Sequence, residues 1–507
     1  MDAKYDIGVI HRSCADGAMP PGLAEVFTEF HRQQISYCYW KSSRRLLAVL
    51  AGEGDIDLLV ARSDQHLVQV ILLDRDFKLF ASVADRDHPA TQSFLGYDER
   101  SGLLIHIHLH FQLILGERLL KNYRMPWEEA ILNRAIFYPA LPIRGLDPMD
   151  EAVLLVVRVC LELGWLDPMT FREGEATKRK FALDREVLAL LVDRTALRHR
   201  ATELLGEDLA EPVVDAFFGE QPLETQVQLR RLVRKHVAAY RSYNAAEARV
   251  RNAWRALVWV AGNLNKRVLH APRPWNRRAP GGGFMVALMG VDGSGKSTSV
   301  TTMRAWLGAK IDVVPFYFGT GDGRPSLFLW PFKLVMPLAM RLLKTKPRVA
   351  SHGKISSRPP GFSYSLLMTV WAVFVALDKR KKLMAARRAT NRGLIVLTDR
   401  YPQNQIRGFN DGPLLTRLTR VPNWLRRFEG APYALAGRLA PDLVIKLIVT
   451  PEVASRREPG MDPAVIRERI AALRQLEIPG ARVVCVDAEQ PLADMIRVVK
   501  REIWRLI

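Results

Sequence analysis

The stretch FMVALMGVDGSGKST, residues 284–298, decides the fold of the C-terminal half of the chain. It begins with an apolar run typical of a buried strand and continues with the pattern G-x-x-x-x-G-K-[S/T] ahead of a predicted helix. Glycines in such a loop let successive backbone N–H groups converge on phosphate groups, and the N-terminus of the following helix adds positive potential. Strand, loop and helix in this order predict a phosphate-binding loop.

Lys296 and Ser297 give this loop its predicted chemistry. Lys296 can reach the β- and γ-phosphates of ATP, and the hydroxyl of Ser297 can ligate Mg²⁺. We expect ATP to contact the whole loop, which consists of Gly290, Val291, Asp292, Gly293, Ser294, Gly295, Lys296, Ser297 and Thr298. The alternative, an ordinary glycine-rich turn, is disfavoured because the full pattern seldom arises by chance and because a predicted strand precedes it.

A second stretch with chemical character is LIVLTDRY, residues 394–401. It places Asp399 at the carboxyl end of an apolar strand, where an open parallel sheet gathers its ligands. Asp399 can hold Mg²⁺, directly or through water, and the planar guanidinium of Arg400 matches the oxygens of an acceptor phosphate. Taken alone, an Asp-Arg pair at a strand end has a structural role about as often as a ligand-binding role. After a phosphate-binding loop it indicates a ligand site.

The apolar patterning predicts an α/β fold for this half of the chain. Apolar runs rich in β-branched residues occur at 284–289, 311–318, 393–398, 443–449 and 482–486, with helical periodicity between them. Continuous apolar strands that alternate with helices indicate a parallel sheet covered on both faces. The Pro- and Gly-rich stretch 271–283 interrupts helical patterning, and we interpret it as a linker.

Upstream of that linker the sequence predicts two further segments. Residues 1–145 show a mixed pattern, with apolar strands at 57–60 and 103–109, and indicate a small α+β domain. Residues 146–270 are almost entirely helical in pattern, beginning with an N-cap signal before a helix at 152–163. We therefore expect four parts: 1–145, the helical domain 146–270, the linker 271–283 and the α/β domain 284–507.

With these motifs in place, the domain at 284–507 resembles the thymidylate kinase family of P-loop kinases. The phosphate-binding loop is close to that family's version, and Asp399, Arg400 and Tyr401 match its Asp-Arg-aromatic motif. Residues 441–453, PDLVIKLIVTPEV, resemble its Pro-Asp strand and the Pro-Glu turn that follows. The resemblance implies a P-loop NTPase fold and an ATP- and Mg²⁺-dependent phosphotransferase that acts on a (deoxy)nucleoside monophosphate such as dTMP.

The resemblance also implies residue roles. Asp292 would contact or orient the acceptor, while Arg400, Tyr401 and Arg380 would bind it. Arg456 and Arg457 would act as lid arginines that stabilise the transferring phosphoryl group, and Asp487 and Ala488 would contact the adenine. The implied catalytic set is Lys296, Asp292, Asp399, Arg400, Arg456 and Arg457. The sequence departs from the family at 316–324 and 402–407, which are acceptor-side segments, so the identity of the acceptor stays open.

Two carboxylates at i and i+2 mark the N-terminal domain. Asp55 and Asp57 share one face of a predicted strand and could share Mg²⁺. With the turn around Lys41, this pattern resembles the polymerase-β-type nucleotidyltransferase superfamily, although Lys-Ser replaces the usual Gly-Ser. His108 stands where a third metal-binding acid is expected. The alternating histidines 106, 108 and 110 either form a metal cluster or are hydrogen-bonded structural residues, and the Asp-Ile-Asp run could also be an ordinary strand entry.

The net charge and the composition of the chain limit the kinds of partner that it is expected to bind. The chain has a formal net charge of +21, and residues 324–429 carry +17 of it, which favours phosphates, nucleic acid or an anionic membrane surface; a solvated face is the alternative. No helix-turn-helix or stacking-aromatic module accompanies the charge, so nucleic acid is not expected. The four cysteines form no C-x-x-C pair and the N-terminus has no signal-peptide pattern, which predicts a cytoplasmic protein.

Three hypotheses remain from the sequence. The first is a kinase for a phosphorylated small-molecule acceptor. The second keeps the kinase but places its acceptor on an anionic membrane, contacted by the basic segment and its apolar stretches 327–342 and 366–375, so that the protein is peripheral to the membrane. The third is a binding protein switched by ATP, with a degenerate nucleotidyltransferase module. The oligomeric state, including a dimer, stays open.

Overall fold

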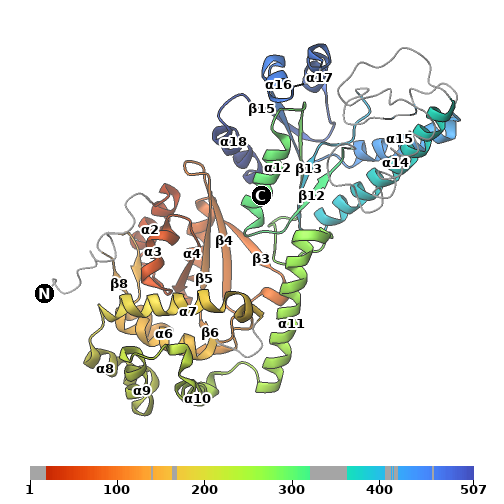
Figure 1. The fold of residues 1–507 in the computed structure, drawn as a ribbon. Coiled ribbons are helices and arrows are strands. Elements are labelled where there is room, and N and C mark those ends of the chain that lie inside the picture. Colours follow the sequence, from red (N-terminus) through yellow and green to blue (C-terminus); the bar gives the residue numbers. More distant parts are fainter. Residues whose placement is uncertain are drawn as a thin grey trace. The chain divides into compact units, whose positions relative to one another are not determined.

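The structure is a computed structural model that describes residues 19–138, 141–162, 168–319, 362–405, 413, 415, 421–459 and 462–507. The chain divides into two compact units, Met1–Leu264 and Asn265–Ile507 (Figure 1). Residues 146–264 of the predicted helical region thus share a unit with the α+β region that precedes them, and residues 265–270 belong to the second unit.

The second unit is built on an all-parallel sheet. Its strands are β11 (Met285–Gly290), β12 (Val313–Tyr317), β13 (Ile395–Asp399), β14 (Leu443–Ile448) and β15 (Arg482–Asp487). They lie in the order β12-β13-β11-β14-β15, and each neighbouring pair is parallel. Every strand overlaps one of the five predicted apolar runs, so the predicted α/β class with a parallel sheet is confirmed. The inner strands β11, β13 and β14 are almost fully buried, as a sheet covered on both faces requires.

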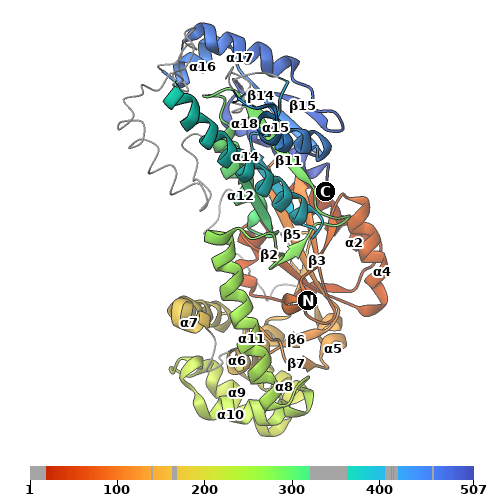
Figure 2. The same cartoon turned by 90° about the vertical axis from the view of Figure 1, so that its right-hand side faces the viewer.

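Helices cover both faces of this sheet. They are α12 (Lys296–Gly308), α14 (Phe362–Thr390), α15 (Asn423–Arg438), α16 (Pro451–Arg457), α17 (Pro463–Gln475) and α18 (Leu492–Trp504). α12 lies on one face and α14 and α15 lie on the other, and α18 packs beside α12 (Figures 1 and 2). The loop between β11 and α12 therefore opens at the carboxyl edge of the sheet.

The stretch 271–283 lies within the second unit and is bound to it. The backbone N–H groups of Trp275 and Asn276 donate to the Asp312 carboxylate at 2.7 and 2.6 Å. Gly283 N–H donates to Thr390 O at 3.2 Å, and a Cβ at Gly283 would come within 2.4 Å of a backbone carbonyl. These contacts make the segment an ordered N-terminal extension of the α/β unit.

The first unit contains a mixed sheet and a small hairpin. Its strands are β1 (Tyr37–Tyr39), β2 (Asp55–Val60), β3 (Lys78–Ser82), β4 (Thr91–Asp98), β5 (Leu103–His110), β6 (Leu113–Leu115), β7 (Tyr123–Met125), β8 (Ile136–Phe137) and β9 (Arg144–Gly145). Those of the main sheet lie in the order β3-β4-β5-β2-β1-β9-β8, and β6 pairs with β7. The central neighbours β2 and β5 are parallel, whereas β4 is antiparallel to β5.

Helices surround the sheet of this unit. They are α2 (Pro21–Arg32), α3 (Leu46–Leu50), α4 (Gln65–Asp74), α5 (Glu128–Arg134), α6 (Pro148–Glu162), α7 (Pro168–Ala189), α8 (Arg194–Leu205), α9 (Glu207–Phe218), α10 (Val227–His236) and α11 (Ala245–Leu264). One core joins α2, α3 and α4 to one sheet face through residues such as Ile56 and Ile107. A second core joins α5, α6 and the later helices to Cys38, Trp40 and Leu59 on the opposite face.

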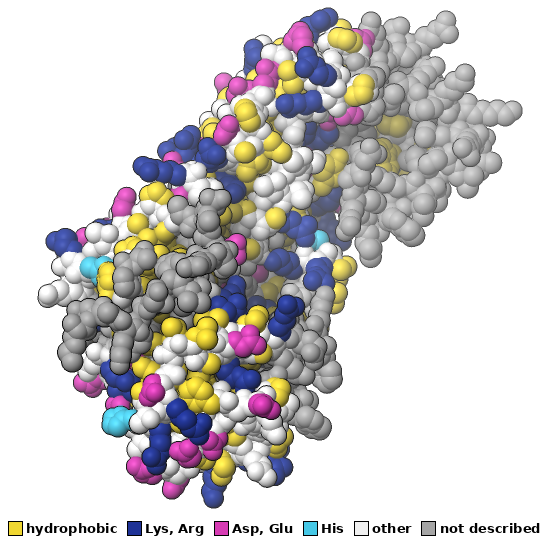
Figure 3. All heavy atoms as spheres, turned by 60° about the vertical axis from the view of Figure 1, so that its left-hand side comes forward, with side chains coloured by type: hydrophobic (Ala, Val, Ile, Leu, Met, Phe, Trp, Pro, Cys, Tyr) yellow, Lys and Arg dark blue, Asp and Glu magenta, His cyan; other side chains and the backbone are white. Residues whose placement is uncertain are grey.

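On the face shown in Figure 3, Lys and Arg side chains are scattered among hydrophobic and acidic ones. About half of the basic segment 324–429 lies outside the described residues, including its apolar stretch 327–342. No helix in the described part of the chain is both long enough and apolar enough to cross a bilayer.

Candidate functional site

The glycine-rich loop of the second unit has the backbone that its sequence predicts. Gly293 and Gly295 have φ values of 79° and 86°, a left-handed conformation that glycine adopts without strain. At Gly290 a Cβ would lie 2.3 Å from the hydroxyl of Ser294, so only glycine fits beneath the loop. That Ser294 hydroxyl is buried and has no hydrogen-bond partner among the described residues. Tight curvature and the start of α12 at Lys296 give a cradle of backbone N–H groups suited to phosphate.

Lys296 lies inside this cradle. Its ammonium donates to Val291 O at 2.6 Å and lies 3.8 Å from the Asp292 carboxylate. Burial and, to a lesser extent, the charge of Arg400 lower the pKa of Lys296 to about 8, while Asp292 and Asp399 oppose the shift. The loop therefore concentrates positive charge around a lysine whose charged form a bound anion would stabilise.

Ser297 and Asp399 meet at the open end of the loop. The Ser297 hydroxyl donates to Asp399 Oδ2 at 2.9 Å, although 102 positions separate the two residues in the chain. The other carboxylate oxygen, Oδ1, is buried without a hydrogen-bond partner among the described residues. A hydroxyl and a carboxylate side by side, with spare oxygen capacity, are hard oxygen donors of the kind that Mg²⁺ takes. The two residues thus fit the magnesium role predicted for them.

The Asp292 carboxylate forms ion pairs with two arginines. Its Oδ1 accepts a hydrogen bond from Arg400 Nη2 at 2.8 Å, and its Oδ2 accepts one from Arg469 Nη1 at 3.1 Å. With Lys296 nearby, three cations surround one carboxylate. The group keeps a net positive charge, and Asp292 fixes the direction of both guanidinium groups.

The backbone of Arg400 is strained. Arg400 has a φ of 69°, a left-handed conformation that costs a residue with a Cβ about 1–3 kcal/mol. Its N–H donates to Leu288 O at 3.0 Å, which holds this turn against β11. The next residue, Tyr401, is buried and its hydroxyl donates to Ala436 O at 3.0 Å, so it anchors α15. The strained turn directs Arg400 to the site while Tyr401 points into the core.

The residues predicted for the lid and the adenine site lie around the same edge of the sheet. Arg456 and Arg457 are exposed on α16, which borders the loop: a Cβ at Gly293 would lie 3.3 Å from that of Arg457. The guanidinium of Arg457 donates to Ala488 O at 3.0 Å. Ala488 follows β15 and is buried, whereas Asp487 is exposed. Arg457 and Ala488 are therefore brought together beside the loop.

Arg380, the remaining acceptor-site prediction, is exposed on α14. Its neighbour Lys379 is buried and donates to the Tyr433 hydroxyl at 2.9 Å, and Lys382 donates to Tyr317 O at 2.9 Å. The structure brings Lys382, rather than Arg380, to the carboxyl end of β12.

Arg469 was not predicted from the sequence, although a signal for it exists. It lies on α17 between Ile466 and Ile470, both of which are buried. An arginine within the apolar face of an amphipathic helix needs a buried or partly buried anionic partner. That pattern could have identified Arg469 as a residue of interest, but nothing local names Asp292 as its partner.

The N-terminal carboxylates lie beside three histidines. β2 and β5 are parallel, with Asp55 opposite His106 and Asp57 opposite His108. The Asp55 carboxylate is 2.8 Å from His106 Nδ1, and Asp57 Oδ1 is 3.2 Å from His108 Nδ1. All of these side chains extend from the face opposite the α2–α4 core. The structure thus brings the predicted metal-binding acids and the predicted histidine row together.

Electrostatics favours an ionised Asp57 and a neutral His110. Burial opposes ionisation of Asp57, but the charge of Lys41 and hydrogen bonds from His108 and His110 hold the pKa of Asp57 well below its usual range. Burial lowers the pKa of His110 to about 3. Burial also lowers the pKa of Lys41 to about 7, although Asp57 opposes that shift. The ammonium of Lys41 lies 3.5 Å from the centroid of the Trp40 ring.

Two distant acids hold the turn that follows Lys41. Ser43 donates from its N–H to Glu151 at 2.8 Å, and the Ser42 hydroxyl donates to Asp184 at 2.8 Å. Arg44 pairs with the same Asp184 carboxylate at 2.8 Å. Burial raises the pKa of Glu151 to about 7, and the Ser43 hydrogen bonds limit the rise. The helical region therefore fixes the turn that presents Lys41.

These features define the second unit as a parallel α/β unit with a glycine-rich phosphate loop. No model of a known protein family matches the chain. Over 224 residues it is 30% identical to YghS of Escherichia coli K12, covering 43% of this chain and 92% of YghS. Over 237 residues it is 26% identical to YghR of the same strain, covering 46% of this chain and 90% of YghR. Both relatives are named uncharacterized ATP-binding proteins. The chain belongs to the same family as YghS.

Proposed function

We propose that the second unit is an ATP- and Mg²⁺-dependent phosphotransferase of the thymidylate-kinase-like type. It would transfer the γ-phosphoryl group of ATP to a phosphorylated small molecule, in the first place a (deoxy)nucleoside monophosphate. The proposal rests on one arrangement of side chains. The Ser297 hydroxyl donates to Asp399 beside the phosphate-binding loop. In that loop, the Asp292 carboxylate accepts hydrogen bonds from Arg400 and Arg469. The relatives' description as ATP-binding proteins supports ATP as the donor.

On the donor side, the chain's own groups account for nucleotide binding. The loop N–H groups and the N-terminus of α12 would hold the phosphates, and Lys296 would leave Val291 O to pair with them. Ser297 and Asp399 would hold Mg²⁺, which neutralises charge on the β- and γ-phosphates. The glycine at 290 is required because any side chain there would displace Ser294.

On the acceptor side, Arg400 and Arg469 would bind the acceptor phosphate. Both guanidinium groups are held by one carboxylate, so each is already oriented before a ligand arrives. Phosphoryl transfer needs little covalent chemistry from the protein, because the acceptor phosphate oxygen is itself the nucleophile. Catalysis would therefore consist of aligning two anionic groups and compensating their charge with Lys296, Arg400 and Arg469.

The proposal is tested with Lys296→Ala and its control Lys381→Ala, which changes an exposed lysine of α14. ADP formation is measured with a panel of ribo- and deoxynucleoside monophosphates in the presence of Mg²⁺. We expect turnover with one or a few acceptors, a loss of about 10²-fold or more for Lys296→Ala, and no loss for the control. ATP binding that Lys296→Ala abolishes, without turnover on any acceptor, would instead support an ATP-switched binding protein.

A membrane-linked acceptor is the second candidate, and one described feature favours it. On α14, Leu366 and Val370 are exposed by 57% and 41%, one helical turn apart, and exposed Arg380 and Lys381 follow them. A helix that carries both an exposed apolar pair and exposed basic side chains is suited to an anionic lipid surface. Flotation with vesicles containing phosphatidylserine at low salt tests this role. Leu366→Asp combined with Val370→Asp would reduce co-flotation, and no flotation of the unaltered protein would rule the candidate out.

A further inference from the structure

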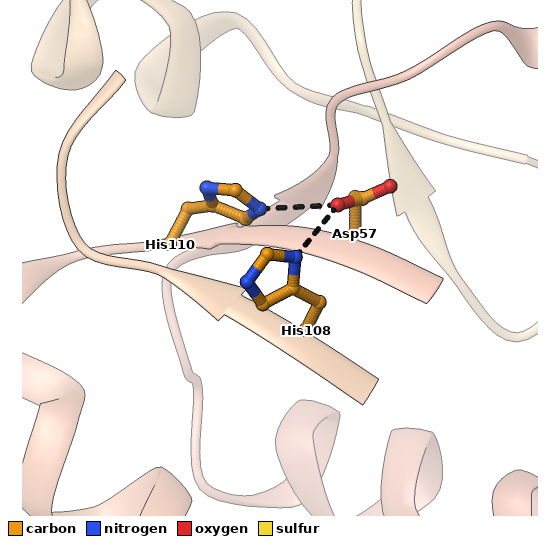
Figure 4. A group of neighbouring side chains, drawn as sticks. All are labelled: Asp57, His108 and His110. Carbon is orange, nitrogen blue, oxygen red and sulfur yellow. Dashed lines mark hydrogen bonds and ion pairs between the residues drawn. The ribbon is translucent and has the colours of Figure 1, made fainter. Parts of the chain in front are cut away.

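In the first unit, one carboxylate and two imidazoles converge on a single point. Asp57 extends from β2, while His108 and His110 extend from the same face of the neighbouring strand β5 (Figure 4). Both rings approach the same oxygen, Asp57 Oδ1, with His108 Nδ1 at 3.2 Å and His110 Nε2 at 3.1 Å. One ligand atom from each of the three residues lies within 4.8 Å of the others.

These separations suit a shared metal ion. With metal–ligand bonds of about 2.1 Å, neighbouring ligand atoms lie about 3.0–3.4 Å apart in octahedral or tetrahedral sites. The two measured distances of 3.1 and 3.2 Å fall within that interval. Hydrogen bonding alone could place one imidazole on each carboxylate oxygen. Both rings instead converge on one oxygen, which places a nitrogen of each ring and that oxygen around a common point where one ion could lie.

The environment keeps the ligand set in place yet accessible. Trp40 packs edge-on against the His110 ring, with centroids 4.9 Å apart, and the His106 ring stacks on that of His108 at 5.8 Å. The Asp57 and His108 side chains are 18% and 21% exposed, so an ion can reach them from solvent. His106 in turn lies 2.8 Å from Asp55, which makes that pair an outer support for the row.

We propose that Asp57, His108 and His110 bind one divalent transition-metal ion of the Zn²⁺, Co²⁺ or Fe²⁺ type. Two imidazoles and one carboxylate suit these ions, whereas Mg²⁺ prefers oxygen ligands throughout. The inference departs from the Mg²⁺ that resemblance implies for Asp55 and Asp57. It is also independent of the function proposed for the second unit. Three protein ligands leave coordination positions for water or a ligand oxygen.

The test uses the full chain without an affinity tag, stripped of metal by a chelator and titrated with Co²⁺ in excess Mg²⁺. Excess Mg²⁺ occupies oxygen-only sites, including that of Ser297 and Asp399. We expect one equivalent of Co²⁺ to bind with visible ligand-field absorption and to be displaced by Zn²⁺. His108→Gln and Asp57→Asn should each weaken binding at least about tenfold, the cost of disturbing even an outer partner of a metal site.

His66→Gln is the matched control, because His66 is an exposed histidine on α4 of the same unit. Zn²⁺ should also raise the melting temperature of the unaltered protein and of this control, but not that of His108→Gln. His108 is partly exposed, so its replacement leaves the core intact and gives a folded variant to measure. Absence of stoichiometric Co²⁺ binding, binding unchanged by both substitutions, or displacement by Mg²⁺ would each overturn the proposal.

Discussion

Replacing Glu151 with Gln is expected to remove a pH-dependent loss of stability from the first unit. Glu151 is buried on α6, where its carboxyl accepts hydrogen bonds from Ser43, and burial raises its pKa to about 7 from 4.5. Between these values the unfolded chain has lost the proton and the folded chain still holds it. Since the folded state then binds more protons, the free energy of unfolding falls as pH rises from about 5 to 7 and is level above that.

The size of the effect follows from the shift. One pKa unit corresponds to about 1.4 kcal/mol, so the full shift is worth about 3 kcal/mol, of which roughly 2–3 kcal/mol lies between pH 5 and pH 8. Gln imitates the protonated acid and keeps an oxygen for Ser43. When the pH is raised from 5 to 8, the free energy of unfolding of the unaltered protein should therefore fall by roughly 2–3 kcal/mol relative to that of Glu151→Gln.

Urea unfolding read by hydrogen exchange in peptides of α6 is the suitable assay, because two units need not unfold together. Glu99→Gln serves as control, since Glu99 is exposed in the turn between β4 and β5. Equal pH profiles for Glu151→Gln and the unaltered protein would refute the reasoning. So would a loss of stability as the pH falls below 5, which would mean that the pKa of the carboxyl is lower in the folded chain than in the unfolded chain.

Three further predictions concern the second unit. Arg469→Ala should lower kcat/KM with the acceptor about 10–100-fold, the value of a charged hydrogen bond, while Arg467→Ala on the exposed side of α17 should not; equal kinetics would contradict the role of Arg469. Gly290→Ala should abolish nucleotide binding measured by calorimetry, whereas Gly437→Ala, where a Cβ meets nothing within 4 Å, should bind normally and melt at a higher temperature. Asp399→Asn should raise the Mg²⁺ concentration for half-maximal ADP formation about tenfold or more, and an unchanged requirement would exclude Asp399 as a ligand.

The fold of the second unit was predictable because its inner strands β11, β13 and β14 are buried on both faces. Continuous apolar runs then coincide with strands, and each predicted run overlaps one of β11 to β15. The phosphate loop was predictable for a related reason: its glycines, lysine and hydroxyl are adjacent in the chain and needed no tertiary contact to be identified. Asp399 at the end of β13 followed from the same strand pattern.

The partners of these residues were less accessible to sequence reasoning. Arg469 and Asp292 are 177 positions apart, and Glu151 and Ser43 are 108 apart, so only the packing of helices against sheets joins them. In the first unit, the i, i+2 spacing predicted that the two carboxylates share one face of their strand and that the alternating histidines share one face of theirs. The register that sets Asp57 opposite His108 depends on a parallel crossover, which no local pattern specifies.

Asp292 shows how charge placement, more than the motif, sets the chemistry of the loop. A carboxylate among phosphate-binding groups repels an anionic ligand, and alone it would weaken ATP binding. Here the same carboxylate holds Arg400 and Arg469 and lies 3.8 Å from Lys296, so the cluster remains cationic. Arg400 also occupies a strained backbone conformation, which costs free energy and is maintained by the structure around it. A guanidinium held in this way between the loop and α17 is suited to a second phosphate group, as the proposed phosphotransferase requires.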